Sequence, residues 1–452
     1  MTVLLFILGV ALVAVGIALS IALHEVGHLV PAKLFGVRVP QYMVGFGKTV
    51  WSFRRGETEY GFKALPLGGY VSMIGMYPPA QDHDGAVRQS STGMFQQLAA
   101  DARKAAAEQL RPGDENRLFY RLPVWKRITI MLGGPLMNLL IGTLLIGVVV
   151  TGFGTVQLTS TVSEVYQCVV ADDEQASRAA AGTEACQPGD PEAPAYAAGL
   201  RPGDTITSFD GEAVEERGWM ELTELIRAAA GREVTIGYLR DGEERATTLT
   251  PLLTERPAVD INGQRIANPD GSTRTVQVGF VGMGSEQRLM TLPPAEVPGL
   301  VGENVRAVAG VVLDLPARLA AVARAAFSDE PRDPNGPISV VGVGRIAGEV
   351  SAMEEIPLQS RVSTLIGLVA SLNIALFVFN LVPLLPLDGG HIAGALWEAL
   401  RRGVAKVFRR RDPGPVDIAK LLPLTYVVAA LMLGMGLLLI YADIVKPVNL
   451  FG

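Results

Sequence analysis

The sequence His24-Glu25-Val26-Gly27-His28 combines residue types and spacing that can perform metal-dependent chemistry. Two histidines four residues apart lie on one face of a helix, about 6 Å apart, so both rings can reach one metal ion. A glutamate between them can accept a proton from a water molecule on that metal. The motif therefore predicts a zinc-dependent hydrolase, with Glu25 as the general base.

A zinc hydrolase usually takes three ligands from the protein and leaves one position for water. The chain has only four histidines, so few residues can supply the third ligand. The strongest candidate is Asp388, in the segment from Asn380 to His391. Two alternatives stay open: His391 could be the third ligand, and Asp388 could merely cap a helix. A purely structural zinc would more often use cysteines, and both cysteines lie elsewhere in the chain.

Both halves of this site lie at the ends of long apolar segments. Four segments have the length and the lack of charge needed to cross a bilayer: Val3 to Val30, Ile128 to Val150, Ser363 to Leu385 and Leu424 to Ile440. The first lacks the basic start of a signal peptide, is too long for one and carries the histidine motif, so we interpret it as a membrane span.

The first and third spans are expected to cross the bilayer in the same direction, because one complete return lies between them. Their C-terminal ends, with His24 and Asp388, would then reach the same membrane face. Pro383 and Pro386 are expected to break the third helix there and to free backbone groups that must line a polar cavity or be buried in protein. Ionisable residues at such a depth are functional candidates.

Positive charge is unevenly distributed along the chain. The loops 38–127 and 401–411 are rich in lysine and arginine, whereas the stretch 154–355 has more acidic than basic residues. The positive-inside rule predicts that both basic loops are cytoplasmic, that the long stretch is extracytoplasmic and that the active site lies near the cytoplasmic face. The net charge of −6 gives no indication of nucleic-acid binding. Cys168 and Cys186, the only cysteines, fall in the extracytoplasmic stretch, where a disulfide or two free thiols are both open.

Residues 45–76 alternate in the manner of a β-hairpin. Its second half ends in Gly68-Gly69-Tyr70, where glycines permit a tight bend or a close backbone approach. The hairpin is either a small cytoplasmic element or an edge beside the active site that pairs with an extended substrate. Residues 78–116 predict a polar surface insertion with a helix near Met94 to Leu110, in which His83 is a solvated loop residue.

The pattern of residues 193–254 predicts a compact α+β module. We expect the module to begin further upstream, near Thr155. The turn Gly199 to Asp204 is followed by a strand, Thr205 to Phe209, a helix, Trp219 to Ala230, and two further strands, Glu233 to Leu239 and Arg245 to Thr250. This order resembles a circularly permuted bacterial PDZ domain, a module that binds a peptide by strand addition. The chain has one such turn, which predicts one PDZ domain. Pro257 to Gly284 is expected to add a strand pair, and Val301 to Phe327 to form an amphipathic helix, with the chain then lying along the membrane surface.

The whole chain resembles the site-2 protease family of intramembrane zinc metalloproteases, specifically the bacterial regulator-of-sigma-E protease group. The segments that carry this resemblance are His24 to His28, Gly68 to Tyr70, Gly134 to Asn138, the PDZ turn and Asn380 to Gly390. Many members have proline where this chain has Leu385, and the better-known members have two PDZ domains. The resemblance implies zinc held by His24, His28 and Asp388.

The resemblance also assigns further roles. Glu25 would be the catalytic base, Asn380 would assist substrate binding or polarisation, and the hairpin carrying Gly68, Gly69 and Tyr70 would be membrane-associated. Substrates would be single-span membrane proteins, such as anti-sigma factors after a first cleavage, or remnant signal peptides. The PDZ groove would bind a peptide or substrate and act as a gate.

The predicted fold is therefore a polytopic α-helical membrane protein with about four transmembrane helices, a membrane-associated β-hairpin and an extracytoplasmic α+β PDZ domain. The expected regions are 1–35, first transmembrane helix with the zinc motif; 36–123, cytoplasmic hairpin and polar insertion; 124–153, second transmembrane helix; 154–290, PDZ domain; 291–361, membrane-proximal helical linker; 362–397, third transmembrane helix and metal-ligand motif; 398–423, basic cytoplasmic loop; and 424–445, fourth transmembrane helix.

Two other functions compete with proteolysis. A non-catalytic membrane PDZ adaptor with a structural metal would have no need of Glu25. A metal transporter is disfavoured because polar residues are nearly absent from the second and fourth spans.

Overall fold

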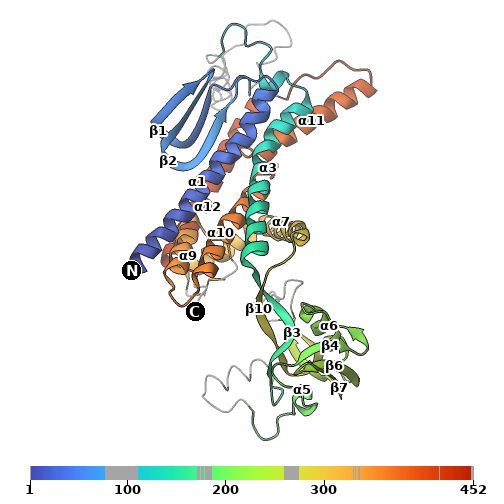
Figure 1. The fold of residues 1–452 in the computed structure, drawn as a ribbon. Coiled ribbons are helices and arrows are strands. Elements are labelled where there is room, and N and C mark those ends of the chain that lie inside the picture. Colours follow the sequence, from blue (N-terminus) through green and yellow to red (C-terminus); the bar gives the residue numbers. More distant parts are fainter. Residues whose placement is uncertain are drawn as a thin grey trace. The chain divides into compact units, whose positions relative to one another are not determined.

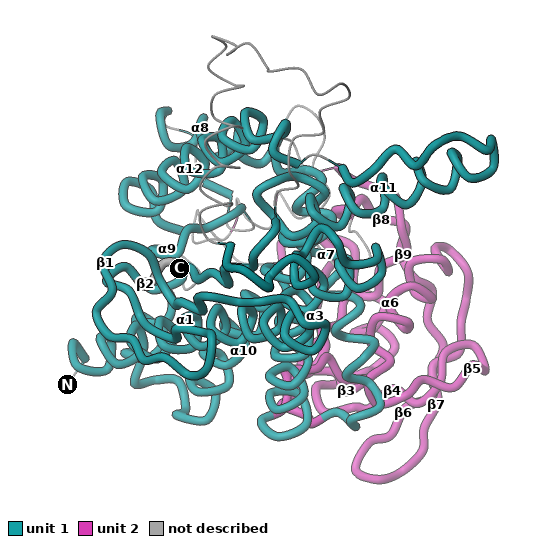
Figure 2. The backbone as a smooth tube through the Cα atoms, turned by 90° about the horizontal axis from the view of Figure 1, so that it is seen from above, with its two compact units in different colours: residues 1–153, 292–452 teal, residues 154–291 magenta. Residues whose placement is uncertain are grey.

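The chain folds into two compact units, which Figure 2 shows in different colours: residues 1–153 together with 292–452, and residues 154–291. The computed structural model describes residues 2–76, 110–170, 174, 178, 186–258, 274–328, 330, 332–333, 336–416 and 418–448. His83 and nearly all of the helix expected near Met94 to Leu110 lie outside these residues. We call the two parts unit 1 and unit 2.

Unit 1 is built around four helices that are long and apolar enough to cross a membrane, by length and composition, in the described part of the chain. They are α1 (Thr2–Leu34), α3 (Val124–Val148) with the π-helical turn η2 (Val149–Phe153), α10 (Leu358–Asn380), and α12 (Leu422–Val445) with the preceding η4 (Ile418–Leu421). Figure 1 shows α1, α3 and α10 side by side, and each contacts the other two. These helices fit a polytopic membrane protein.

The contact between α1 and α3 is a close backbone approach. A Cβ atom on Gly27 would overlap the carbonyl oxygen of Gly133, and one on Gly133 would overlap the carbonyl oxygen of Gly27. Glycine on both sides is therefore what allows the two helices to approach this closely, as small residues commonly do in membranes.

The third span ends earlier than the sequence predicted. We expected Ser363 to Leu385, whereas α10 ends at Asn380. Pro383 and Pro386 follow in an irregular segment, because proline has no N–H to donate and disfavours helical backbone in the residue before it. The next helix, α11 (Asp388–Val407), begins at the predicted third ligand.

The predicted hairpin is present as β1 (Gln41–Arg55) and β2 (Thr58–Ser72). Residues 41–44 partner residues 69–72 and also residues 59–62, so the segment 69–72 is an edge among the described strands. Tyr42 Oη donates to the Ala22 carbonyl of α1 at 2.8 Å, and Lys33 Nζ donates to Tyr60 Oη at 2.7 Å. These bonds hold the hairpin against the end of α1 that carries the histidine motif.

A buried ion pair fixes α11 against α3. Arg127 donates two hydrogen bonds to the Glu398 carboxylate, at 3.0 and 2.5 Å. The Glu398 side chain is fully buried and also accepts from the backbone amide of Val416 at 3.0 Å. Since losing one partner would leave a buried charge uncompensated, this pair constrains where α11, and with it Asp388, can lie.

Three further helices complete unit 1: α7 (Val297–Leu313), α8 (Leu315–Phe327) and α9 (Val340–Ala352). The single helix predicted over Val301 to Phe327 is wrong, because the helix ends at Leu313 and a second begins at Leu315. Pro316 explains the break: it removes one helical hydrogen bond and is tolerated only in the first turn of the next helix.

Unit 2 contains a sheet with the strand order β10-β3-β4-β6-β7, and β5 pairs with β4. Its elements are β3 (Thr155–Val165), α5 (Pro194–Ala197), β4 (Thr205–Phe209), β5 (Glu212–Ala213), α6 (Trp219–Ala228), β6 (Val234–Arg240), β7 (Glu243–Leu249) and β10 (Met283–Met290). The side chains of Ile206, Phe209, Leu222 and Ile236 are fully buried in its core. Cys168 and Cys186 form a disulfide.

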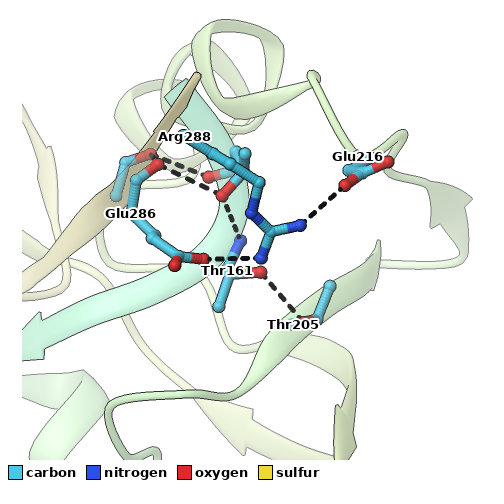
Figure 3. A network of polar contacts seen from close by, with 7 residues as sticks. Thr161, Thr205, Glu216, Glu286 and Arg288 are labelled. Carbon is cyan, nitrogen blue, oxygen red and sulfur yellow. Dashed lines mark hydrogen bonds and ion pairs between the residues drawn. The ribbon is translucent and has the colours of Figure 1, made fainter. Parts of the chain in front are cut away.

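The strand pair predicted within Pro257 to Gly284 is not formed as expected. β9 (Thr275–Phe280) pairs with β8 (Leu252–Pro257), whereas β10 pairs with β3 at the edge of the larger sheet. Figure 3 shows how β10 is held: Arg288 contacts Glu216, in the segment before α6, at 3.1 Å, and Glu286 at 3.0 Å. The edge strand and the segment before α6 are thus joined by side chains.

Candidate metal centre

Three side chains from two helices meet where α1 passes the beginning of α11. His24 and His28 lie one turn apart on α1, and Asp388 is the first residue of α11. The two Nε2 atoms are 3.2 Å apart, and Asp388 Oδ2 lies 3.4 Å from His24 Nε2 and 3.3 Å from His28 Nε2. Among the described residues, these three form the one group of possible metal ligands.

These distances fit a zinc ion. In a tetrahedral site with bonds of about 2.0–2.1 Å, two ligand atoms lie about 3.3–3.4 Å apart. Unprotonated ring nitrogens and a carboxylate oxygen repel one another at this distance unless a cation lies between them. Asp388 Oδ2 is also buried without a hydrogen-bond partner. The donor set and its spacing therefore fit the metal that the motif predicts.

The ring of His28 is fixed by the backbone of α3. Its Nδ1 lies 2.8 Å from the carbonyl oxygen of Ile130, so Nδ1–H donates and Nε2 keeps its lone pair for a metal. Pro135 lies inside α3 and cannot donate to the carbonyl of Met131. This turn of α3 therefore lacks one helical hydrogen bond, and the missing bond lies next to the Ile130 carbonyl that holds His28.

The ring of His24 is held by Asn138, a residue to which the sequence assigned no role. The Asn138 side-chain amide lies 3.1 Å from His24 Nδ1, and Asn138 is completely buried. Its Oδ1 atom has no partner. With His24 Nε2 on a metal, Nδ1 carries a proton, and turning the amide gives that proton an acceptor. An amide inside an apolar span is the signal that marks this residue.

Gly134 leaves the space that the centre occupies. A Cβ atom at this position would overlap His28 Nε2 and lie 2.7 Å from His24 Nε2. A side chain on α3 would therefore compete directly with the metal. In the sequence, this requirement is indicated by the run Gly133-Gly134-Pro135 within an apolar span, part of which belongs to the segment Gly134 to Asn138 that carries the family resemblance.

Glu25 is buried next to the edge of the hairpin. It is 9% exposed, and a Cβ atom on Gly69 would lie 2.9 Å from its Cγ atom. The backbone of Val71 hydrogen-bonds to its carboxylate. The structure thus brings the predicted base and the predicted glycine edge into direct contact.

The remaining predicted residues lie around this group. Gly68 has φ +116° and lies against the Phe46 ring. Tyr70 stacks on Phe46 and donates to Gln41 Oε1 at 3.2 Å. Asn380 is the last residue of α10 and is half-buried. His391, the alternative third ligand, is not part of the group of three.

Comparison with known proteins identifies the family. The profile of "Peptidase family M50" matches residues 12–410. Zinc metalloprotease Rip1 of Mycobacterium tuberculosis is 34% identical over 457 residues, which cover 99% of this chain and 100% of the relative. Rip1 of Mycolicibacterium smegmatis is 32% identical over 99% of this chain and 100% of the relative. Metalloprotease MmpA of Caulobacter vibrioides is 27% identical over 85% of each chain.

Relatives named zinc metalloproteases, together with a His-His-Asp group that can hold a metal, give zinc as the cofactor. The apolar helices place the chemistry in a membrane protein. The chain belongs to peptidase family M50, the site-2 protease family, and is an intramembrane zinc metalloprotease.

Proposed function

We propose that the chain cleaves single-span membrane proteins within their transmembrane segment, at a zinc ion held by His24, His28 and Asp388. The observation that carries this proposal is the set of 3.2–3.4 Å separations among the three ligand atoms. Anti-sigma factors after a first cleavage, or remnant signal peptides, are the substrates we expect. We place the centre near the cytoplasmic face, because the two basic loops flank it in sequence.

Glu25 is the general base in this proposal. Zinc, when bound, supplies Lewis-acid activation of a water molecule and stabilises negative charge on the attacked carbonyl oxygen. Glu25 accepts the proton from that water and passes it to the leaving amine. Its burial against Gly69 keeps the carboxylate in one place, so the proton has a short path. Asn380, at the end of α10, assists in binding or polarising the substrate.

The hairpin edge is the proposed substrate-binding element. A transmembrane helix hides its peptide bonds, so it must unwind before cleavage, and its freed backbone groups need partners in the membrane. The segment 69–72 is an edge beside Glu25 and can pair with an extended substrate. Gly68, Gly69 and Tyr70 belong to this edge, and the lack of a side chain on Gly69 lets the edge lie directly against Glu25.

Unit 2 is the proposed PDZ domain, on the extracytoplasmic side. β10 is the edge strand of its sheet, and Val281 and Met283 at its beginning share the core with Leu222 and Ile226 of α6. A peptide added to β10 would extend this sheet by one strand, which is how PDZ domains bind peptides. We propose that this groove takes a peptide or substrate segment and excludes proteins with bulky extracytoplasmic domains.

Reconstituted cleavage tests this function. The purified protein and a single-span substrate are placed in the same vesicles, and cleavage is followed with and without a zinc chelator. We expect chelation to reduce cleavage to background and added zinc to restore it. A membrane adaptor with a structural metal would bind the substrate and cleave none of it under any of these conditions. Cleavage that survives complete zinc removal would exclude the proposed mechanism.

Replacing Asn138 with leucine is expected to weaken zinc binding by about 10- to 100-fold, because the His24 ring loses the partner that orients it. Zinc affinity is measured by competition with a chromogenic chelator. Asn373→Leu is the matched control: it removes an equally buried amide, which donates to Ser20 Oγ at 2.9 Å and does not contact a ligand ring. Equal losses in both variants would mean that Asn138 acts only through folding.

A further inference from the structure

Helix α11 presents an apolar face that no other part of the described chain covers. We call it the α11 face. Its residues repeat at helical spacing and are between 47% and 77% exposed: Leu396, Trp397, Leu400, Val404, Val407 and the capping residue Phe408. The opposite side packs within unit 1, where Ala395, Glu398 and Ala405 are buried. Figures 1 and 2 show the far end of α11 extending past α3.

Four cations gather where this helix ends. Lys406, Arg409, Arg410 and Arg411 are exposed, and we call them the basic cluster. Within the described residues none of their side chains has an ion pair, unlike the neighbouring Arg402, which contacts Glu398 at 3.2 Å and Asp412 at 3.3 Å. The basic cluster is therefore available to bind an anionic partner.

We propose that the α11 face and the basic cluster bind the anionic phospholipid surface of the membrane. An exposed apolar stripe beside free lysine and arginine is the pattern of a helix that lies in the lipid interface. Trp397 has the amphipathic ring that favours headgroup depth. The helix also begins only a few residues after α10 ends, so it starts at the membrane boundary.

Charge argues against a second copy of the chain as the occupant. A symmetric contact between two α11 faces brings the same patch of each chain together. Where the two helices run in the same direction, the two basic clusters would lie next to each other and repel. An anionic bilayer surface instead attracts each nearby lysine or arginine, and the attraction weakens as salt screens it.

This surface would also steady the metal centre. α11 begins at Asp388, and the Arg127–Glu398 pair holds its middle. Lipid contact at the C-terminal end of α11 would hold the helix at a third position, in addition to its beginning and its middle. Docking itself does not depend on the proposed function, so a catalytically inactive protein would dock as well.

The test uses full-length protein carrying Val404→Cys, labelled with a polarity-sensitive dye; Cys168 and Cys186 are joined to each other and do not react. The protein is reconstituted in vesicles of phosphatidylcholine, with or without phosphatidylglycerol. We expect the dye to enter an apolar environment only with the anionic lipid, and high salt to reverse this. Arg409, Arg410 and Arg411 are then replaced together by glutamine. This variant should need on the order of 100-fold more anionic lipid than the unmodified protein to give the same dye response.

The matched control changes the same amount of charge in unit 2, with Arg201, Arg245 and Arg274 replaced by glutamine, and should leave the response unchanged. Salt dependence of the unmutated helix tests the proposal even where the triple variant fails to fold. Equal dye burial in neutral and anionic vesicles, insensitive to salt, would overturn it. Efficient cross-linking of two chains through residue 404 would overturn it as well, in favour of a second copy.

Discussion

Glu25→Gln is expected to lower the rate of peptide cleavage by about 100- to 10,000-fold while zinc stays bound. Glutamine has nearly the same size and shape as glutamate, so the burial against Gly69 and the position of both histidines should be preserved. The amide cannot accept the proton that the carboxylate accepts. The rate is measured in vesicles with a single-span substrate, and zinc content is measured on the same samples.

The control for this variant is Glu355→Gln, which removes one carboxylate from an exposed position. It should cleave at the rate of the unmodified protein. If Glu25→Gln keeps its activity within a few fold, Glu25 is not the base. If the variant loses its zinc, its inactivity follows from the missing metal and does not assign proton transfer to Glu25.

Gly134→Ala is expected to remove zinc and activity together. The new methyl group would overlap His28 Nε2 and lie 2.7 Å from His24 Nε2, the two nitrogen atoms that we propose as metal ligands. Neither ring can simply move aside, because the Ile130 carbonyl holds one at 2.8 Å and Asn138 holds the other at 3.1 Å. We expect metal content near zero in the purified protein, although alanine is a better helix former than glycine.

The control lies on the same helix. Gly147→Ala makes the same substitution where the nearest atom to the new Cβ is 3.9 Å away, so ordinary van der Waals contact results. This variant should keep its zinc and its activity. A Gly134→Ala protein with full zinc content would show that the metal is bound somewhere other than beside α3.

The sequence predicted the residues that meet at the centre but not what holds them. His24, His28 and Asp388 are recognisable because their types and their places at the ends of apolar segments are local properties. Asn138 is 114 residues from His24, and its role follows only from where α1 crosses α3. That crossing depends on glycines packing against glycines, which no periodicity in one segment reveals.

The two errors in helix boundaries have a common physical origin. The third span was predicted to continue to Leu385 because hydropathy carries no information on where helical hydrogen bonding ends. In the structure the helix ends at Asn380. The helix predicted across Pro316 was continued for the same reason, since both sides of the proline are amphipathic. In both regions proline decides the boundary and apolar patterning does not.

The three residues of the proposed centre come from α1 and α11, so the centre joins two helices that lie far apart along the chain. A ribosome that has released only the first span has produced a motif with two imidazoles and no carboxylate to close it. On the proposed ligand set, newly made protein gains its third ligand only after its third apolar helix, α10, has been made. The topology itself delays hydrolytic competence until biosynthesis is nearly complete.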